Sequence, residues 1–275
     1  MAQHVIGFTL WSLGLRETVE SLEAAAEMGF GHVQLAFRQE TDLEPAGLER
    51  IRRALEGTGV EAVAGMIDFA REDYSTIASI RETGGLVPTA RYEERLDHCR
   101  RAGRAYAALG LTHVTTHVGF LPDAGSEAYG EVVDRIGKAV DALVGAGLGV
   151  GLETGQESAS QLLEFLADLG RPEVSVNYDP ANLVLYGTDD PLEAARMLAS
   201  RVKLAHMKDA RRSDRPGEVW GVEVPLGEGE VPFPAVLAAL EEGGFGGPLV
   251  IECEGGEDRR GDILAGRDRL RKWLG

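Results

Sequence analysis

The sequence predicts a single α/β domain over residues 1–275, folded as a (β/α)8 TIM barrel. The chain has 275 residues, a length that suits one barrel of this kind. A helix-like stretch, a glycine and a β-branched run recur along the sequence, which gives eight strand–helix units. The alternative is a doubly wound open sheet, but no glycine-rich dinucleotide fingerprint follows the first strand-like run.

The predicted elements follow in order along the chain. Strands are expected near residues 4–9, 31–36, 60–66, 111–117, 148–153, 173–179, 201–207 and 248–253. Helices are expected near residues 16–28, 44–57, 91–109, 127–146, 158–168, 190–199, 233–242 and 262–273. The helix near 91–109 carries apolar residues at steps of three or four, which indicates a core-facing stripe. These residues are Leu96, Cys99, Ala102, Tyr106 and Leu109.

Two connections, residues 67–90 and 208–231, are much longer than the others. Both follow predicted strands, so both belong to the C-terminal face of the barrel, where active-site loops lie in this fold. We therefore expect both connections to cover a site, with glycines such as Gly227 and Gly229 allowing movement.

Composition excludes several function classes. The chain has 28 Lys+Arg against 45 Asp+Glu, a formal charge of −17, which disfavours duplex nucleic acid and anionic membranes as partners. The short basic cluster Arg211, Arg212 and Arg215 is too small to offset this charge. No apolar run is long enough to span a membrane, and the N-terminus lacks the pattern of a signal peptide. With two cysteines, Cys99 and Cys253, the expectation is a soluble cytoplasmic protein without a disulfide framework.

Four metal-type side chains end four successive strand-like runs: Glu153, Asp179, His206 and Glu252. Taken singly, each has a plainer explanation, since Asp179 precedes a proline and a lone histidine is often a core residue. Because neighbouring barrel strands lie about 4.8 Å apart, however, the four side chains can reach one ion. Carboxylates and an imidazole suit Mn²⁺, Co²⁺, Mg²⁺ or Zn²⁺. The sequence therefore predicts one divalent metal ion, with Mn²⁺ as the first choice.

At these residues the chain resembles a known family. The segments LET, NYDPANL, HMKD, LGEGEV and IECEG resemble the sugar phosphate isomerase/epimerase group of xylose isomerase-like barrels, which also contains endonuclease IV. The resemblance implies that Glu153 and Glu252 are the catalytic acid/base pair as well as metal ligands. It implies proton transfer next to a sugar carbonyl through a metal-bound enediolate, in an isomerase or epimerase.

The resemblance also implies substrate-binding residues. They are Arg212, with Arg211 as its alternative, and His117, which could instead be a barrel-interior residue stacked with Thr115 and His113. Trp11, just after the first strand, could form an apolar wall or simply pack. Asn182 stands where many epimerases have a histidine, and Gln34 where a glutamate is common.

Other readings are open at this point. An inosose dehydratase-type lyase would begin with the same proton removal. An endonuclease IV-like activity is disfavoured because the third strand ends in Gly65-Met66-Ile67-Asp68, without the histidine of a three-zinc site. A non-catalytic metal- or sugar-binding member is disfavoured because all four ligands are present. The sugar, its phosphorylation, and a homodimeric or homotetrameric state are left open by the sequence.

Overall fold

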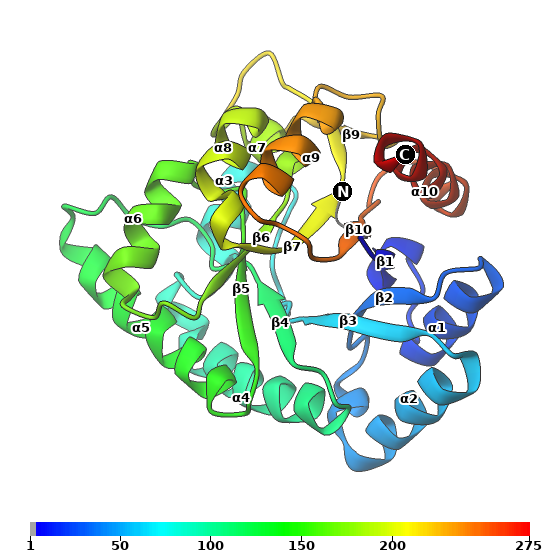
Figure 1. Cartoon of the computed structure of the whole chain (residues 1–275). Coiled ribbons are helices and arrows are strands. Elements are labelled where there is room, and N and C mark those ends of the chain that lie inside the picture. The colour runs from blue at the N-terminus through cyan, green and yellow to red at the C-terminus, as the bar shows by residue number, and fades with distance from the viewer. Residues whose placement is uncertain (1–3) are drawn as a thin grey trace.

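The protein folds as a closed barrel of eight parallel strands, described by a computed structural model for residues 4–275 (Figure 1). Around the barrel the strands run in the order β1-β10-β7-β6-β5-β4-β3-β2. Their bounds are β1 (Ile6–Thr9), β2 (His32–Ala36), β3 (Glu61–Met66), β4 (His113–Thr116), β5 (Gly149–Glu153), β6 (Ser175–Tyr178), β7 (Val202–Met207) and β10 (Leu249–Ile251). The predicted (β/α)8 barrel is confirmed.

Helices surround the barrel because each presents one apolar stripe to the strands. The helices of the outer ring are α1 (Thr18–Glu27), α2 (Pro45–Thr58), α4 (Tyr92–Ala108), α5 (Glu127–Val144), α6 (Ala159–Leu169), α8 (Pro191–Leu198), α9 (Phe233–Glu242) and α10 (Arg259–Leu274). Within the part of the chain that the structure describes, none of the helices combines the length and apolar character needed to cross a membrane.

The stripe predicted for α4 is buried against the barrel, with Leu96, Cys99 and Tyr106 almost fully covered. The Tyr106 hydroxyl donates to the backbone carbonyl oxygens of Leu35 and Met66, at 3.1 and 2.6 Å. A Cβ at Gly65 would lie 2.6 Å from the Tyr106 ring, so glycine is required where this helix meets β3.

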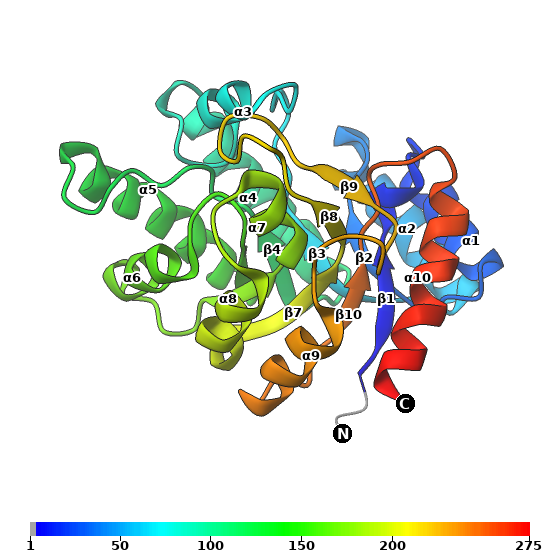
Figure 2. The same ribbon diagram turned by 90° about the horizontal axis from the view of Figure 1, so that it is seen from above.

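The two long connections contain structure that the sequence did not predict. Residues 67–90 include the short helix α3 (Ile77–Thr83), and residues 208–231 include an antiparallel ribbon of β8 (Asp209–Arg211) and β9 (Val222–Val224). Another short helix, α7 (Pro180–Tyr186), begins directly after Asp179. Figure 2 shows α3 and the β8–β9 connection at one end of the barrel, with the start of β1 and the last turn of α10 at the other end. Both connections therefore lie on the face that the sequence predicted for them, at the C-terminal ends of the barrel strands.

Candidate metal centre and pocket

Glu153, Asp179, His206 and Glu252 converge at the C-terminal ends of four consecutive barrel strands. Each offers one ligand atom, and these four atoms all lie within 4.8 Å of one another. The Nδ1 atom of His206 lies 3.0 Å from Glu153 Oε1, 3.4 Å from Glu252 Oε2 and 3.8 Å from Asp179 Oδ2. The four side chains therefore lie close together, as the sequence predicted.

The chemistry of the four residues fits a divalent cation. All four side chains are buried, and three carboxylates held this closely repel one another unless a cation offsets their charge. Asp179 Oδ1 accepts hydrogen bonds from the backbone N–H groups of Ala181 and Asn182 and so caps α7. Its Oδ2 is buried and accepts no hydrogen bond from the described residues. This oxygen is paired only with a cationic side chain, the Lys208 ammonium at 2.9 Å, and it lies beside the other three ligand atoms, so it could serve as a ligand atom.

Gln34 fixes the orientation of His206. The Nε2 atom of His206 lies 2.7 Å from Gln34 Oε1, and Gln34 Nε2 donates to Thr115 Oγ1 at 2.7 Å. Gln34 and His206 are both fully buried. With Nε2 facing Gln34, Nδ1 faces the three carboxylates, where it would carry either a proton or a bound metal ion. The sequence shows only that Gln34 replaces a glutamate common in the family, and does not predict its contact with His206.

Lys208 is a member of the site that the sequence analysis missed. Its buried ammonium lies 2.6 Å from Glu252 Oε2 and 2.9 Å from Asp179 Oδ2, the latter without hydrogen-bond geometry. Burial by itself lowers the pKa of Lys208, but Asp179 and Glu252 outweigh burial and raise it well above its usual range. A signal was present, because alternate residues of an extended chain face the same side, and Lys208 lies two residues after His206.

The charges of the site hold Glu252 ionised. Burial raises the pKa of Glu252, but Lys208 and His206 outweigh burial and lower it well below its usual range. For His206, burial lowers the pKa, while Glu252 and Glu153 raise it well above its usual range. His206 therefore takes up a proton readily, because the neighbouring carboxylates favour a positive charge beside them.

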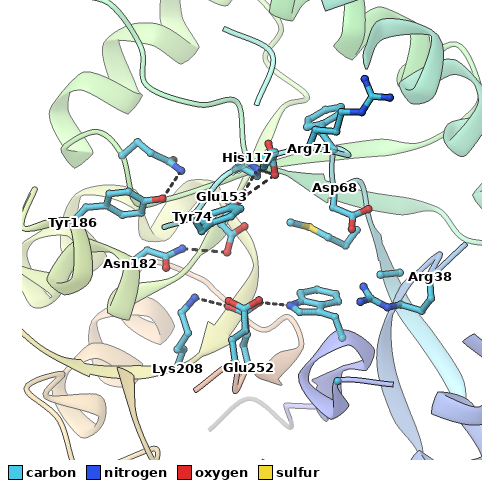
Figure 3. Close-up of a pocket in the computed structure, with 18 of the residues that line it drawn as sticks. Arg38, Asp68, Arg71, Tyr74, His117, Glu153, Asn182, Tyr186, Lys208 and Glu252 are labelled. Carbon is cyan, nitrogen blue, oxygen red and sulfur yellow. Dashed lines mark hydrogen bonds and ion pairs between the residues drawn. The ribbon is translucent and has the colours of Figure 1, made fainter. Parts of the chain in front are cut away.

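A cavity of about 620 Å³ opens in front of the quartet (Figure 3). Two of the predicted substrate-binding residues line it and hold the two glutamates. Trp11 Nε1 donates to Glu252 Oε1 at 2.8 Å, and Asn182 Nδ2 donates to Glu153 Oε1 at 3.3 Å. The whole lining consists of Trp11, Gly14, Ala36, Arg38, Met66, Asp68, Phe69, Arg71, Glu72, Tyr74, His117, Glu153, Gln156, Asn182, Tyr186, Lys208, Glu252, Glu254 and Arg259.

His117 also lines the cavity, directly after β4. Its Nε2 atom lies 3.0 Å from Glu72 Oε2 and 3.2 Å from the Tyr74 hydroxyl, both in the 67–90 connection. That connection therefore forms part of the cavity wall, as expected. Burial lowers the pKa of His117, but Glu72 outweighs burial and the net shift is upward. Glu72 and Tyr74 escaped the sequence analysis because loop side chains carry no periodic signal.

The structure does not bring Arg212 to the cavity. Its exposed side chain donates to the backbone carbonyl of Asp189 at 3.1 Å, and its backbone N–H donates to Glu230 Oε1 at 2.8 Å. Arg211, the alternative, donates to the backbone carbonyl of Glu228. The reason is the unpredicted β8–β9 ribbon, which carries the chain away from the cavity directly after Lys208 and Asp209.

The glycines of the 208–231 connection are held by Asp209. Its Oδ2 atom accepts hydrogen bonds from the backbone N–H groups of Gly227 and Gly229, both at 2.8 Å, and its Oδ1 accepts one from Val231 at 3.2 Å. Asp209 itself is buried. These glycines therefore serve close backbone packing around a carboxylate, where the sequence suggested movement.

The protein is a closed parallel barrel with a buried carboxylate–histidine quartet at four adjacent strand ends, and this quartet could hold a metal ion. Residues 22–273 match the family described as xylose isomerase-like TIM barrel, and the chain belongs to that family. The family resemblance seen in the sequence is thus confirmed. No curated protein matches the chain.

Solved structures share the whole fold. A xylose isomerase domain protein from Planctomyces limnophilus is 30% identical with a TM-score of 0.87, covering 98% of this chain and 95% of that chain. A xylose isomerase-like TIM barrel protein from Mycobacterium smegmatis, in complex with magnesium, is 19% identical with a TM-score of 0.76, covering 99% and 97%. A D-tagatose 3-epimerase-like protein is 19% identical with a TM-score of 0.74, covering 100% and 97%.

Proposed function

We propose that the protein is a divalent-metal-dependent isomerase or epimerase of a sugar, acting by proton transfer next to a carbonyl. The observation that carries the proposal is the placement of two glutamates, Glu153 and Glu252, within a metal-type quartet that borders a cavity of about 620 Å³. A divalent cation, when bound, would polarise the sugar carbonyl and acidify the neighbouring C–H. The likeness to an epimerase-like protein and to a magnesium complex supports this class of chemistry.

Glu153 is the better placed of the two glutamates to take the proton. Its Oε1 faces His206 and Asn182, whereas its Oε2 accepts no hydrogen bond from residues 4–275. Both oxygens of Glu252 are engaged, by Trp11 and by Lys208. Glu252 stays ionised and fixed, while Glu153 keeps one oxygen free toward the cavity. In an epimerase Glu252 would serve the opposite face of the planar intermediate by passing on a proton taken from the Lys208 ammonium, 2.6 Å from its Oε2, and Trp11 and Asn182 would keep the two carboxylates in place.

The second candidate is a lyase of the dehydratase type, which would use the same proton removal and then expel a β-hydroxyl. His117 favours it, because it borders the cavity as a proton donor held by Glu72 and Tyr74. Protonation by His117 would let the hydroxyl leave as water.

One experiment separates the candidates. Purified protein with added Mn²⁺ would be incubated with ketoses in deuterated water, and NMR would follow both deuterium uptake and loss of water. Deuterium at the carbon next to the carbonyl supports the isomerase or epimerase, and an unsaturated product supports the lyase. Glu153→Gln should abolish exchange while keeping the fold, whereas Glu193→Gln, an exposed carboxylate on α8, should not. Turnover with full retention of the substrate hydrogen would overturn the proton-transfer mechanism.

We also propose that the partner is a small sugar and that nucleic acid and membranes are not partners. The formal charge of −17 supports this, as does the engagement of Arg211 and Arg212 with other parts of the chain. Submicromolar binding to abasic duplex DNA at physiological salt would contradict it.

A further inference from the structure

The cavity wall formed by β2 and β3 carries two charged side chains that the proposed chemistry does not use. Arg38 follows the end of β2, and Asp68 follows the end of β3. Both line the cavity in front of the quartet. Figure 3 shows them together on one side of the cavity, opposite Tyr186, Asn182 and Lys208. A ligand chelated at the quartet would thus have this pair at its far end.

Neither side chain has a protein partner that explains its place. Within residues 4–275, Arg38 and Asp68 take part in no ion pair, and neither side chain hydrogen-bonds to another residue. Arg38 Nε is buried without a partner. The buried Nε of Arg38 costs free energy unless a ligand satisfies it, whereas the Asp68 carboxylate is exposed to solvent and open to a ligand.

A second cavity of about 370 Å³ meets the first at these two residues. It shares Arg38, Asp68 and Phe69 with the first cavity. The rest of its lining is Phe37, Gln39, Glu40, Leu43, Ala70, Glu94, Arg95, Asp97, His98 and Arg101. Since a water molecule takes up about 30 Å³ of the liquid, a hexose that displaces about six waters fills roughly 200 Å³. The first cavity alone exceeds one hexose, and the second extends it past Arg38 and Asp68.

From these observations we propose that Arg38 and Asp68 form a second sugar subsite, which binds the uncharged glycosyl unit of a disaccharide or glycoside whose other unit lies at the quartet. The proposal rests on the proposed function and narrows its substrate class. Sugar hydroxyls both donate and accept, so adjacent hydroxyls can bridge a guanidinium and a carboxylate that stand too far apart to pair directly.

The charge of the subsite argues for an uncharged group. A phosphate or carboxylate bound to Arg38 would lie near Asp68, and like charges at short range repel. The second cavity adds the carboxylates of Glu94 and Asp97 as well as the cations Arg95 and Arg101, so it offers no net positive field. Mixed donors and acceptors with an aromatic side chain, Phe69, suit the alternating hydroxyl and C–H surfaces of a sugar ring.

Binding of four probes would test the subsite. They are D-fructose, D-fructose 6-phosphate, and the glucosyl-fructoses isomaltulose and maltulose, whose fructose units keep the free carbonyl and its neighbouring hydroxyl. Dissociation constants would be measured calorimetrically with Mn²⁺ present, for wild type, Asp68→Asn, Arg38→Leu and the control Arg53→Ala. Arg53 lies on α2, lines neither cavity and pairs with Glu49.

We expect wild type to bind at least one glucosyl-fructose about tenfold more tightly than fructose, from charge-assisted hydrogen bonds to the second unit. Asp68→Asn and Arg38→Leu should remove that gain and leave fructose affinity within about twofold, while Arg53→Ala keeps the gain. Asp68→Asn preserves the side-chain shape, so it carries the test if Arg38→Leu does not fold.

Several results would overturn the subsite. They are equal affinity for fructose and both glucosyl-fructoses, tightest binding of the phosphate ester, equal weakening of all sugars by both variants, or no binding of any probe. Deuterium exchange is read separately. Selective binding without exchange on any sugar would leave the subsite standing and reject the proposed chemistry, whereas exchange without selectivity would reject the subsite alone.

Discussion

Gln34 is expected to control metal affinity although it is not a ligand. Replacing it by leucine keeps a similar volume but removes the acceptor 2.7 Å from His206 Nε2, at a position where both residues are fully buried. The histidine would then keep only the Asn177 side-chain amide, 3.3 Å from Nε2, or turn away from the quartet, and a poorly satisfied buried N–H costs about 1–3 kcal/mol. Loss of such an outer partner typically costs 10–100-fold in metal affinity. By RT ln K this equals about 1.4–2.7 kcal/mol.

The assay is competition for Mn²⁺ between the protein and a fluorescent chelator near pH 7.5, with circular dichroism to confirm folding. Gln34→Glu retains an acceptor oxygen and should bind the ion at least as well as wild type. Thr115→Val removes the bond that orients Gln34 and a contact with Met66 Sδ but leaves the acceptor of Gln34 in place, so its effect should be smaller than that of Gln34→Leu. If Gln34→Leu bound Mn²⁺ within twofold of wild type, the argument that this amide sets the histidine orientation would be wrong.

Three further predictions follow from single features. Burial raises the pKa of Glu157 from 4.5 to about 8, so the folded state holds a proton that the unfolded state releases. The free energy of unfolding should therefore fall as pH rises from about 4.5 to 8. Glu157→Gln should remove that loss, at most about 5 kcal/mol, when urea unfolding is compared at pH 5 and pH 8.5. Gly85→Ala should loosen the 67–90 connection, because Gly85 has φ +66° and a Cβ would overlap the Val118 carbonyl. Proteolysis of the connection should become faster, and an unchanged cleavage rate would contradict the prediction. Arg212→Ala should leave catalysis and metal content as in wild type because its side chain lies outside the cavity, and a large rise in KM would show that the β8–β9 ribbon rearranges around substrate.

The barrel and the quartet could be predicted from the sequence because both depend on patterns with a fixed period. A buried parallel strand is a short apolar run, and the residue that ends it must lie on the C-terminal face. From the sequence alone, this pattern predicts that Glu153, Asp179, His206 and Glu252 lie together at one end of the barrel. The same logic applied to the residue two positions after His206 would have found Lys208.

The outer parts of the site could not be predicted in this way. The direction of a loop side chain depends on the path of the whole loop, so Glu72 and Tyr74 gave no signal although they hold His117. Arg212 was misplaced for the same reason. Its position relative to the cavity is decided by the β8–β9 ribbon, whose pairing partners lie in sequence without strand-like apolar runs. The sequence shows that Gln34 replaces a glutamate common in the family. It does not show the contact with His206, because hydrogen bonds across a barrel cannot be predicted from one strand.

The Asp209 carboxylate has a consequence for how this chain can be altered. It binds the backbone of Gly227, Gly229 and Val231, so the two ends of a segment of about twenty residues are fastened to one buried point. Closing a longer loop costs only about 0.6 kcal/mol for each doubling of its length. The exposed tip at residues 214–215, before Pro216 packs on Gly187, is therefore an attachment point where we expect a tag or a further binding element to be tolerated without displacing the quartet.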